Sequence, residues 1–214
     1  VGVLDGNDDV VEVELFQQVD RQWHSKLVSN ISPYLVEGSN IAVLAKTKPM
    51  VKNVPPLLFG NKPTDGGHLL LNRGERDALL WQEPQAARWI KKILGSDEFL
   101  NGQERWCLWL VGISSAELQC MPLVYSRVQK VAEMRGKSAK LSTQKKSKIP
   151  HLFDEIRQPE SGDYILIPRV SSERRTYIPI GFFNSDIISS DRNFILPNGT
   201  LYEFAILTSL MHND

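Results

Sequence analysis

The stretch IPRVSSERRTYIPIGFF, residues 167–183, joins two apolar runs through a polar tip. Isoleucine, valine, tyrosine and phenylalanine dominate the two runs, and such β-branched and aromatic residues favour strands. The tip, residues 171–175, holds two serines, one glutamate and two arginines. The sequence therefore predicts a guanidinium-rich tip that stands on apolar strands.

The segments on either side extend this strand-rich pattern through the last third of the chain. DYILIPRV (163–170) and FILP (194–197) also have the composition of strands, and turn-forming Asn, Ser and Asp residues separate them. A final helix is predicted over TLYEFAILTSLMHN (200–213), directly after Asn198–Gly199.

The middle of the chain has a helical pattern. GERDALLWQEPQAARWIKKILG (74–95) predicts two consecutive helices, with Pro84 at the first position of the second helix and Gly95 as its C-cap. RWCLWLV (105–111) predicts a buried strand. Another helix is expected from Pro122 to about Arg135, with an apolar face and a separate basic face. The apolar face holds Val124, Val128, Val131 and Met134, and the basic face holds Arg127 and Lys130.

The N-terminal part supplies weaker signals. VEVELFQ (11–17) alternates with period two and predicts a half-buried strand. A turn is expected at Ser32–Pro33, followed by a strand near 40–45 and a short strand at 68–71. Together these elements predict a mixed α+β fold with a helical middle segment and a strand-rich C-terminal third.

Charge is balanced overall, at 25 basic and 25 acidic residues, but it is distributed unevenly. Residues 1–20 hold six acidic residues and no Lys or Arg, whereas residues 127–148 hold eight basic residues and one acidic residue. The segment GKSAKLSTQKKSKIP (136–150) has few apolar residues and no period, which predicts a mobile basic loop. Such asymmetry indicates an anionic partner on one face of the protein.

No catalytic, metal or nucleotide motif is visible. The two cysteines and four histidines lack the spacing of a disulfide framework or a metal site. GNKPTDGG (60–67) lacks the Gly-Lys-Ser/Thr of a phosphate loop, and no adenosyl-binding glycine motif follows a strand. NVPPL (53–57) differs from the Asn-Pro-Pro-aromatic loop of amino-group methyltransferases and indicates a turn. Without a signal peptide or a membrane span, a cytoplasmic location is expected.

Two sets of residues have the chemistry of nucleic-acid contacts. Hydroxyl, guanidinium and ammonium groups bind phosphate, while Asn, Asp and Arg pair with the edges of adenine, cytosine and guanine. The candidate backbone contacts are Ser171, Ser172, Arg174, Arg175, Lys137, Lys140, Lys145 and Lys146. The candidate base-reading residues are Ser190, Asp191, Arg192 and Asn193.

Each set also has a plainer interpretation. A lysine-rich segment is commonly only solvated surface, and Glu173 could pair with a neighbouring arginine to hold a turn. Residues 191–193 would suit a polar hairpin turn equally well. From these residues alone, nucleic-acid binding and a plain interaction module remain about equally supported.

A family resemblance separates the two interpretations. The blocks that carry it are NISPYLVEG, FGNKPTDGGHLLL, EPQAARWIKKILGSDEFLNGQERWCLWL, MPLVYSRVQKV, FDEIRQP, YILIPRVSSERRTYIPIGFF and LPNGTLYEFAILTSLMH. In this order they resemble the target-recognition region of single-chain type II restriction–modification enzymes of the IIG or IIL kind. In these enzymes an endonuclease is fused to an N6-adenine DNA methyltransferase. Ala205 departs slightly from the pattern, because relatives often have Gly there.

The resemblance implies a division into residues 1–29, a linker or the end of a preceding methyltransferase domain, and residues 30–212, a DNA target-recognition domain. It implies binding of double-stranded DNA, with the 171–175 tip on the backbone and the stretch NSDIISSDRNF (184–194) reading bases. S-adenosylmethionine is implied for the parent enzyme, whose methyltransferase and endonuclease domains would precede Val1. This excised chain is expected to be inactive alone and to hold no cofactor or metal. The alternative is a protein-interaction or assembly domain that does not read DNA.

Overall fold

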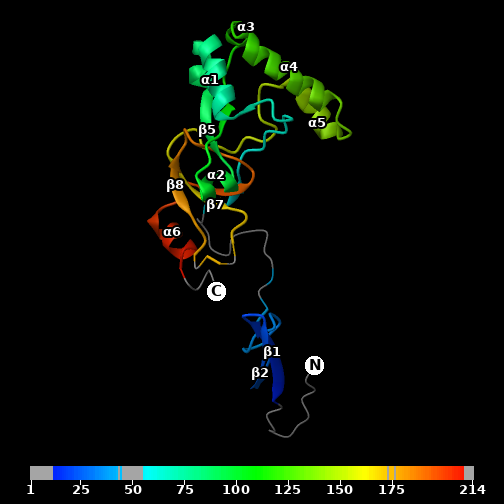
Figure 1. Cartoon of the computed structure of the whole chain (residues 1–214), viewed down its shortest axis with the longest axis vertical. Coiled ribbons are helices and arrows are strands. Elements are labelled where there is room, and N and C mark those ends of the chain that lie inside the picture. The colour runs from blue at the N-terminus through cyan, green and yellow to red at the C-terminus, as the bar shows by residue number, and fades with distance from the viewer. Residues whose placement is uncertain (1–11, 43, 45–54, 173, 176, 210–214) are drawn as a thin grey trace. The chain divides into compact units, whose positions relative to one another are not determined.

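The computed structural model describes residues 12–42, 44, 55–172, 174–175 and 177–209. The chain divides into two compact units, Val1–Lys52 and Asn53–Asp214. Helices and strands are both well represented, as the coloured ribbon in Figure 1 shows, so the predicted α+β class is confirmed.

The first unit is built on a hairpin of β1 (Val13–Val19) and β2 (Gln22–Val28). Its two-residue turn places Asp20 and Arg21 at φ of 50° and 66°. Positive φ at both central residues is the backbone of a type I′ turn, which matches the right-handed twist of the paired strands. The alternation at 11–17 thus indicated a real strand, but the expected half burial is wrong, because Leu15 is the sole buried residue of β1. The partner strand β2 was not predicted.

The described residues after β2 in the first unit contain the predicted turn but not the predicted strand. The amide of Leu35 donates to the carbonyl oxygen of Ser32 at 2.9 Å, which closes the turn at Ser32–Pro33. The strand expected near 40–45 is wrong for the described residues 40–42 and 44, which have no strand pairing. Ile41 and Leu44 are strongly exposed. These apolar side chains are not buried, so burial does not stabilise a strand at the described positions.

The described part of the second unit contains two four-stranded sheets. The first has the order β3-β10-β7-β8, and all its neighbours are antiparallel. Its strands are β3 (Leu58–Phe59), β10 (Asn193–Pro197), β7 (Asp163–Pro168) and β8 (Gly181–Asn184). Five of the six residues of β7 are buried, because apolar clusters cover both faces of the sheet.

The strand predicted from the RTYIPIGFF run begins later than expected. β8 starts only at Gly181, and the described residues 177–180 are not in a strand. Pro179 lies in this run and has no N–H to donate to a neighbouring strand, which explains the late start. Residues 169–180 therefore form a long connection between β7 and β8.

The second sheet has the order β4-β6-β5-β9. Its strands are β4 (Leu70–Leu71), β6 (Trp106–Leu108), β5 (Ile90–Leu94) and β9 (Ile188–Ser189). β9 pairs with β5 in parallel and is followed after a short turn by β10 of the first sheet. The chain segment 188–197 therefore connects the two sheets.

The two consecutive helices predicted over 74–95 are only half correct. α1 (Arg73–Gln82) forms behind an Asn72 capping box, but Pro84–Trp89 makes a short 3-10 helix that leads directly into β5. Pairing of β5 with β6 and β9 outweighs the local helical pattern, because it buries Ile93 and Leu94 in two cores. Gly95 is not a C-cap; it precedes α2 (Ser96–Asn101).

A short helix, α3 (Ser115–Gln119), precedes the longest one, α4 (Pro122–Gly136), which agrees with the prediction. Val124, Val128 and Val131 are buried against the second sheet's core cluster. The predicted basic face is partly used inside the fold, since Arg127 donates to Glu75 Oε1 at 2.8 Å and to the His68 carbonyl at 3.1 Å.

The basic segment after α4 is not the unstructured loop that its composition predicted. It forms α5 (Leu141–Lys145) and a 3-10 turn at Lys146–Lys148. The buried guanidinium of Arg135 explains this order. It donates five hydrogen bonds to backbone carbonyl oxygens, those of Pro63, Thr64, Lys146, Ile149 and Leu152. Burial lowers the pKa of Arg135 from its ordinary value.

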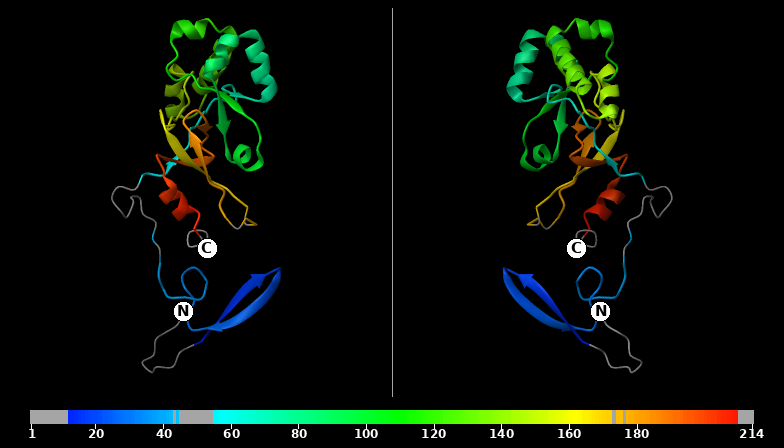
Figure 2. Two further views of the ribbon diagram at one scale, coloured as in Figure 1. Left: turned by 90° about the vertical axis from the view of Figure 1, so that its left-hand side faces the viewer. Right: turned by 90° about the vertical axis from the view of Figure 1, so that its right-hand side faces the viewer.

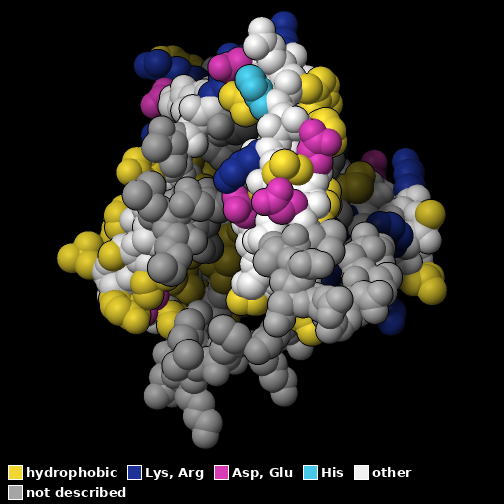
Figure 3. Space-filling view, turned by 90° about the horizontal axis from the view of Figure 1, so that it is seen from below, with side chains coloured by type: hydrophobic (Ala, Val, Ile, Leu, Met, Phe, Trp, Pro, Cys, Tyr) yellow, Lys and Arg dark blue, Asp and Glu magenta, His cyan; other side chains and the backbone are white. Residues whose placement is uncertain are grey.

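The last described helix is α6 (Leu201–Leu207), which starts at a Thr200 capping box. Residues 210–213 of the predicted helix lie outside the described residues. Figure 3 shows hydrophobic side chains gathered on the left edge, where α6 lies in Figure 1. Leu201, Tyr202 and Ile206 are exposed there. Of the helices described, none combines the length and apolarity needed to cross a membrane.

Candidate nucleic-acid interface

A cleft of about 640 Å³ opens in the second unit beside the turn that joins the two sheets. One wall comes from the start of α2 and from Arg105, which directly precedes β6. The opposite wall comes from the end of β7 and the 190–192 turn. Its polar and charged lining residues are Ser96, Asp97, Glu98, Arg105, Arg169, Ser190, Asp191 and Arg192. Three predicted base-reading residues therefore line one cavity.

Backbone hydrogen bonds hold the 190–193 turn in place. The amide of Ser190 donates to the Leu94 carbonyl at 2.8 Å, and the amide of Asp191 donates to the Asn61 carbonyl at 2.9 Å. Within the turn, the amide of Asn193 donates to the Ser190 carbonyl at 3.0 Å. A Cβ at Gly60 would lie 2.1 Å from the Ser190 oxygen, so only glycine permits this approach. The turn is consequently rigid before any ligand binds.

The side chain of Asn193 faces the interior rather than the cleft. It is fully buried, and its Nδ2 donates to the Leu94 carbonyl at 2.8 Å while its Oδ1 accepts from Ser96 Oγ at 3.2 Å. An amide held this way cannot reach a base. The prediction that Asn193 reads a base is therefore corrected: Asn193 joins the sheets and supports the turn.

The other three residues of the turn remain available. Arg192 is exposed, and Ser190 and Asp191 are half-buried at the cleft wall. Among the described residues, no hydrogen bond or ion pair reaches the Asp191 carboxylate or the Arg192 guanidinium. Ser190 Oγ accepts from the Arg192 amide at 3.3 Å. One free carboxylate and one free guanidinium thus project from a fixed backbone.

Arg169 is a cleft residue that the sequence reasoning did not select. Its Nη1 donates to the Asp191 carbonyl at 3.1 Å, and its amide donates to the Arg192 carbonyl at 3.1 Å. The guanidinium also lies over the rings of Phe59 and Phe194, at 5.0 and 5.9 Å from their centroids. These contacts align a cation at the base of the turn. Its position two residues before the Ser–Arg tip was the available signal.

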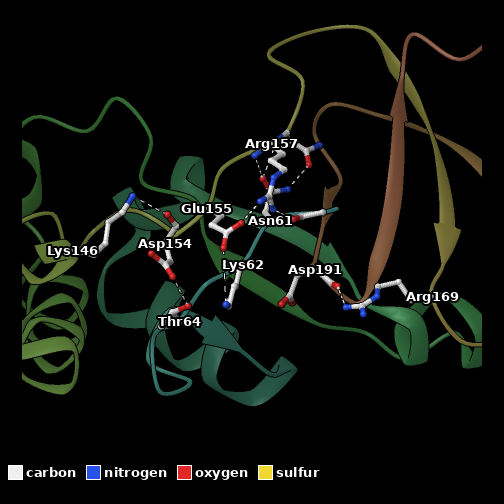
Figure 4. Close-up of polar contacts among 11 residues, drawn as sticks. Asn61, Lys62, Thr64, Lys146, Asp154, Glu155, Arg157, Arg169 and Asp191 are labelled. Carbon is white, nitrogen blue, oxygen red and sulfur yellow. Dashed lines mark hydrogen bonds and ion pairs between the residues drawn. The ribbon is translucent and has the colours of Figure 1, made fainter. Parts of the chain in front are cut away.

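The cleft is backed by a buried polar framework around Asn61. The Asn61 Nδ2 donates to the Ser189 carbonyl at 2.8 Å and to Gln158 Oε1 at 2.9 Å, while its Oδ1 accepts the amides of Arg157 and Gln158. Figure 4 shows Arg169 and Asp191 beside this framework. Figure 4 also shows three further polar contacts beyond Asn61: Lys62 with Glu155, Thr64 with Asp154, and Lys146 with the Asp154 carbonyl. Polar contacts therefore connect the turn with the α5 region.

The described residues of the tip are exposed, as the sequence predicted. The described residues Ser171, Ser172, Arg174 and Arg175 are all exposed. The amide of Arg174 donates to Ser172 Oγ at 3.2 Å, and that of Arg175 donates to the Ser172 carbonyl at 3.1 Å, so the tip is a turn. No described acidic group pairs with either guanidinium. The proposed pairing of Glu173 lies outside the described residues.

The basic segment does not join the tip on one surface. Figures 1 and 2 show α5 beside α4 in the upper part of the second unit, whereas the connection between β7 and β8 lies in its lower part. Lys137, Lys140 and Lys145 are exposed on this separate edge. Lys146 is half-buried, and its Nζ donates to the Asp154 carbonyl at 2.9 Å. The tip and the basic segment therefore form two separate exposed positive regions.

The chemistry of the cleft suits hydrogen-bond recognition of a polar ligand. Its three arginines face three carboxylates, so the cleft offers both donors and acceptors with nearly balanced charge. Phosphate alone would prefer a purely cationic site, whereas base edges present donors and acceptors together. Among the described residues, no group of His, Cys, Asp and Glu side chains could hold a metal ion.

Comparisons with known proteins point to one family. The family model described as MmeI, target recognition domain, matches residues 37–214. DNA methyltransferase A of Bacillus subtilis (strain 168) is 40% identical over 188 residues, which cover 87% of this chain and 21% of the relative. A solved structure of the type IIL restriction-modification enzyme MmeI in complex with DNA matches with a TM-score of 0.86 at 36% identity, covering 96% of this chain and 28% of that one. The chain thus spans between a fifth and a third of these relatives.

Proposed function

This chain belongs to the MmeI target recognition domain family, and from that membership we propose that it recognises a specific sequence in double-stranded DNA. The observation that carries the proposal is the cleft, in which Asp191 and Arg192 project without internal partners from a turn fixed by backbone bonds. A carboxylate accepts from the cytosine amino group, and a guanidinium donates to guanine O6 and N7.

Within this function the cleft reads bases and the tip binds the backbone. Ser171, Ser172, Arg174 and Arg175 offer hydroxyl and guanidinium donors on an exposed turn next to the cleft wall. Phosphate contacts of this kind position a domain on the duplex without carrying sequence information. The order along the chain, with the tip leading from Arg169, would let both contacts form on one stretch of DNA.

The α5 edge plays a separate part in the proposal. Lys137, Lys140 and Lys145 are exposed cations that do not line the cleft, so they would contact the backbone outside the recognised bases. Lys146 is not included among these backbone contacts, because its ammonium donates a hydrogen bond to the Asp154 carbonyl within the fold.

The chemistry on DNA would be supplied by other parts of a longer enzyme. The matched relatives are several times longer than this chain, and one of them is a DNA methyltransferase. We propose that the chain, with residues 30–212 as its recognition domain, holds a target adenine near a methyltransferase domain that uses S-adenosylmethionine. In this proposal, methylation and DNA cleavage are carried out by that longer enzyme.

A second candidate function rests on α6. Its exposed Leu201, Tyr202 and Ile206 form an apolar surface that suits contact with another protein domain. An assembly domain would use this helix and the α5 edge, and would have no need of the cleft.

Duplex binding by the whole chain tests the proposal. A pool of random duplexes should yield a preferred sequence, and affinity for it should fall steeply with salt because phosphate contacts release counterions. The variant Asp191→Asn should alter the preference at one base pair, while Asp163→Asn, an exposed aspartate outside the cleft, should not. Binding without any sequence preference, or no binding, would favour the assembly function instead.

A further inference from the structure

The cleft wall opposite the 190–192 turn contains the third arginine of the cleft, Arg105, which is also held in position. Arg105 Nη1 lies 3.3 Å from Glu98 Oε1, and Glu98 is itself buried. The other carboxylate oxygen, Oε2, accepts the Gly95 amide at 2.8 Å. The Arg105 carbonyl also accepts the Ile93 amide at 3.0 Å, which ties its backbone to β5. Both ends of the Arg105 residue are therefore anchored.

Most of the guanidinium nevertheless remains free. The Arg105 side chain is 47% exposed and lines the same cleft as Asp191 and Arg192. Arginine carries five N–H donors, and the contact with Glu98 is the sole side-chain hydrogen bond of Arg105 among the described residues. A guanidinium that is held at one end and open at the other is prepared for planar, two-point recognition.

The close packing at Gly95 fixes this arginine relative to the turn. A Cβ at Gly95 would lie 2.5 Å from Glu98 Oε2 and 3.2 Å from Ser190 Oγ. Gly95 thus brings the carboxylate that holds Arg105 next to the turn that carries Asp191. The two walls of the cleft therefore pack directly against each other at Gly95.

Resting on the proposed function, we propose that Arg105 is a specificity-determining residue that reads a guanine from the wall opposite the turn, with Glu98 as its positioning residue. Arginine binds guanine O6 and N7 through two parallel donors, and a prealigned fork loses little freedom in doing so. A base is favoured over a phosphate because Asp97 and Asp191 line the same cleft and would repel a phosphate. Their carboxylates instead accept from base amino groups.

Selection of binding sites from random duplexes tests this assignment, using the whole chain and its Arg105→Gln variant. The wild type should select guanine at a position that Asp191→Asn leaves unchanged. Arg105→Gln should lose about ten- to a hundredfold of discrimination at that position only. Arg105→Lys keeps the charge but not the fork, so it should lose the same preference. Glu98→Gln should reduce the preference partially, because it weakens the hold on Arg105.

The matched control is Arg73→Gln, which changes an exposed arginine outside the cleft whose nearest acid, Glu104, lies 3.9 Å away. It should leave the preference unchanged. Two results would overturn the assignment while leaving the proposed function intact. One is an unchanged preference in both Arg105 variants. The other is uniform weakening on all sequences with a shallower salt dependence, which marks a phosphate contact. A wild-type chain without any sequence preference would instead overturn the proposed function, and this assignment with it.

Discussion

The Asn193 side-chain amide donates to the Leu94 carbonyl at 2.8 Å and so joins residues 99 positions apart. The bond connects β10 of one sheet with β5 of the other, directly behind the cleft. Asn193, a residue type that can recognise bases, thus stabilises the junction of the two sheets that holds Asp191 and Arg192 in place.

Asn193→Ala should therefore reduce stability rather than specificity directly. Removing the amide leaves the buried Leu94 carbonyl with one fewer partner, and we expect a loss of about 1–3 kcal/mol in the free energy of unfolding, measured in urea. Arg192→Ala, at the exposed neighbouring position, should change stability by less than about 0.5 kcal/mol and should alter base preference. An Asn193→Ala protein of full stability with a changed base preference would contradict the corrected role.

Arg135→Met should be among the most destabilising single changes. Methionine fills similar space but leaves five part-buried carbonyl oxygens without the guanidinium, so the expected cost is about 3 kcal/mol in urea unfolding. Amide exchange should become faster throughout 141–152, because Arg135 connects α4 to that segment. Arg88→Met, which removes an exposed arginine paired with Glu117, should cost less than about 1 kcal/mol.

Arg135 also illustrates what the sequence could and could not predict. Local signals were sufficient for α4 and the exposed Ser–Arg tip, since apolar periodicity and Pro122 are sequence properties. The order of α5 depends on one buried guanidinium that contacts Pro63 and Thr64, more than seventy positions earlier. β5 was predicted as helix for the same reason, because its partners β6 and β9 lie elsewhere in the chain.

The candidate site divides in the same way. Asp191 and Arg192 were predicted from residue chemistry, and the structure places both at the cleft. Arg105 and Arg169 were not selected, because an isolated arginine in a sequence gives no sign of the carboxylate or rings that hold it. Asn193 and Lys146 were selected by type, and tertiary contacts assign both to the interior framework.

His151 should make stability depend on pH in the mildly acidic range. Burial, assisted by the nearby charge of Arg135, lowers the pKa of His151 below its ordinary value of 6.5. The unfolded chain then takes up the proton first, so stability is retained above about pH 6.5 and falls as the pH drops towards the lowered value. His151→Gln should flatten the urea-unfolding free energy between pH 7 and 5. An unchanged slope in that variant would exclude His151 as the cause.

The stability of the hairpin in the first unit should depend on how readily residue 21 adopts a positive φ. Its φ of 66° is strained for any side chain and most for a β-branched one. Arg21→Gly should slow amide exchange in β1 and β2, by up to about 1 kcal/mol in local stability, whereas Arg21→Val should accelerate it. Equal exchange in all three proteins would contradict the type I′ assignment.

The two positive regions should differ in how their contribution depends on duplex length. Arg174→Ala with Arg175→Ala removes two exposed guanidinium groups next to the cleft wall, so the slope of log affinity against log salt should become shallower by about 1.8 on every duplex that contains the recognised sequence. Replacing Lys137, Lys140 and Lys145 by Ala should reduce the slope only on duplexes that extend well beyond that sequence, because α5 lies apart from the connection that carries the tip. Neither variant should change which bases are preferred, since phosphate contacts carry no sequence information. Fluorescence anisotropy with short and long duplexes over a salt series measures both effects. A lysine variant whose slope falls equally on short and long duplexes would place α5 over the recognised bases and contradict this division.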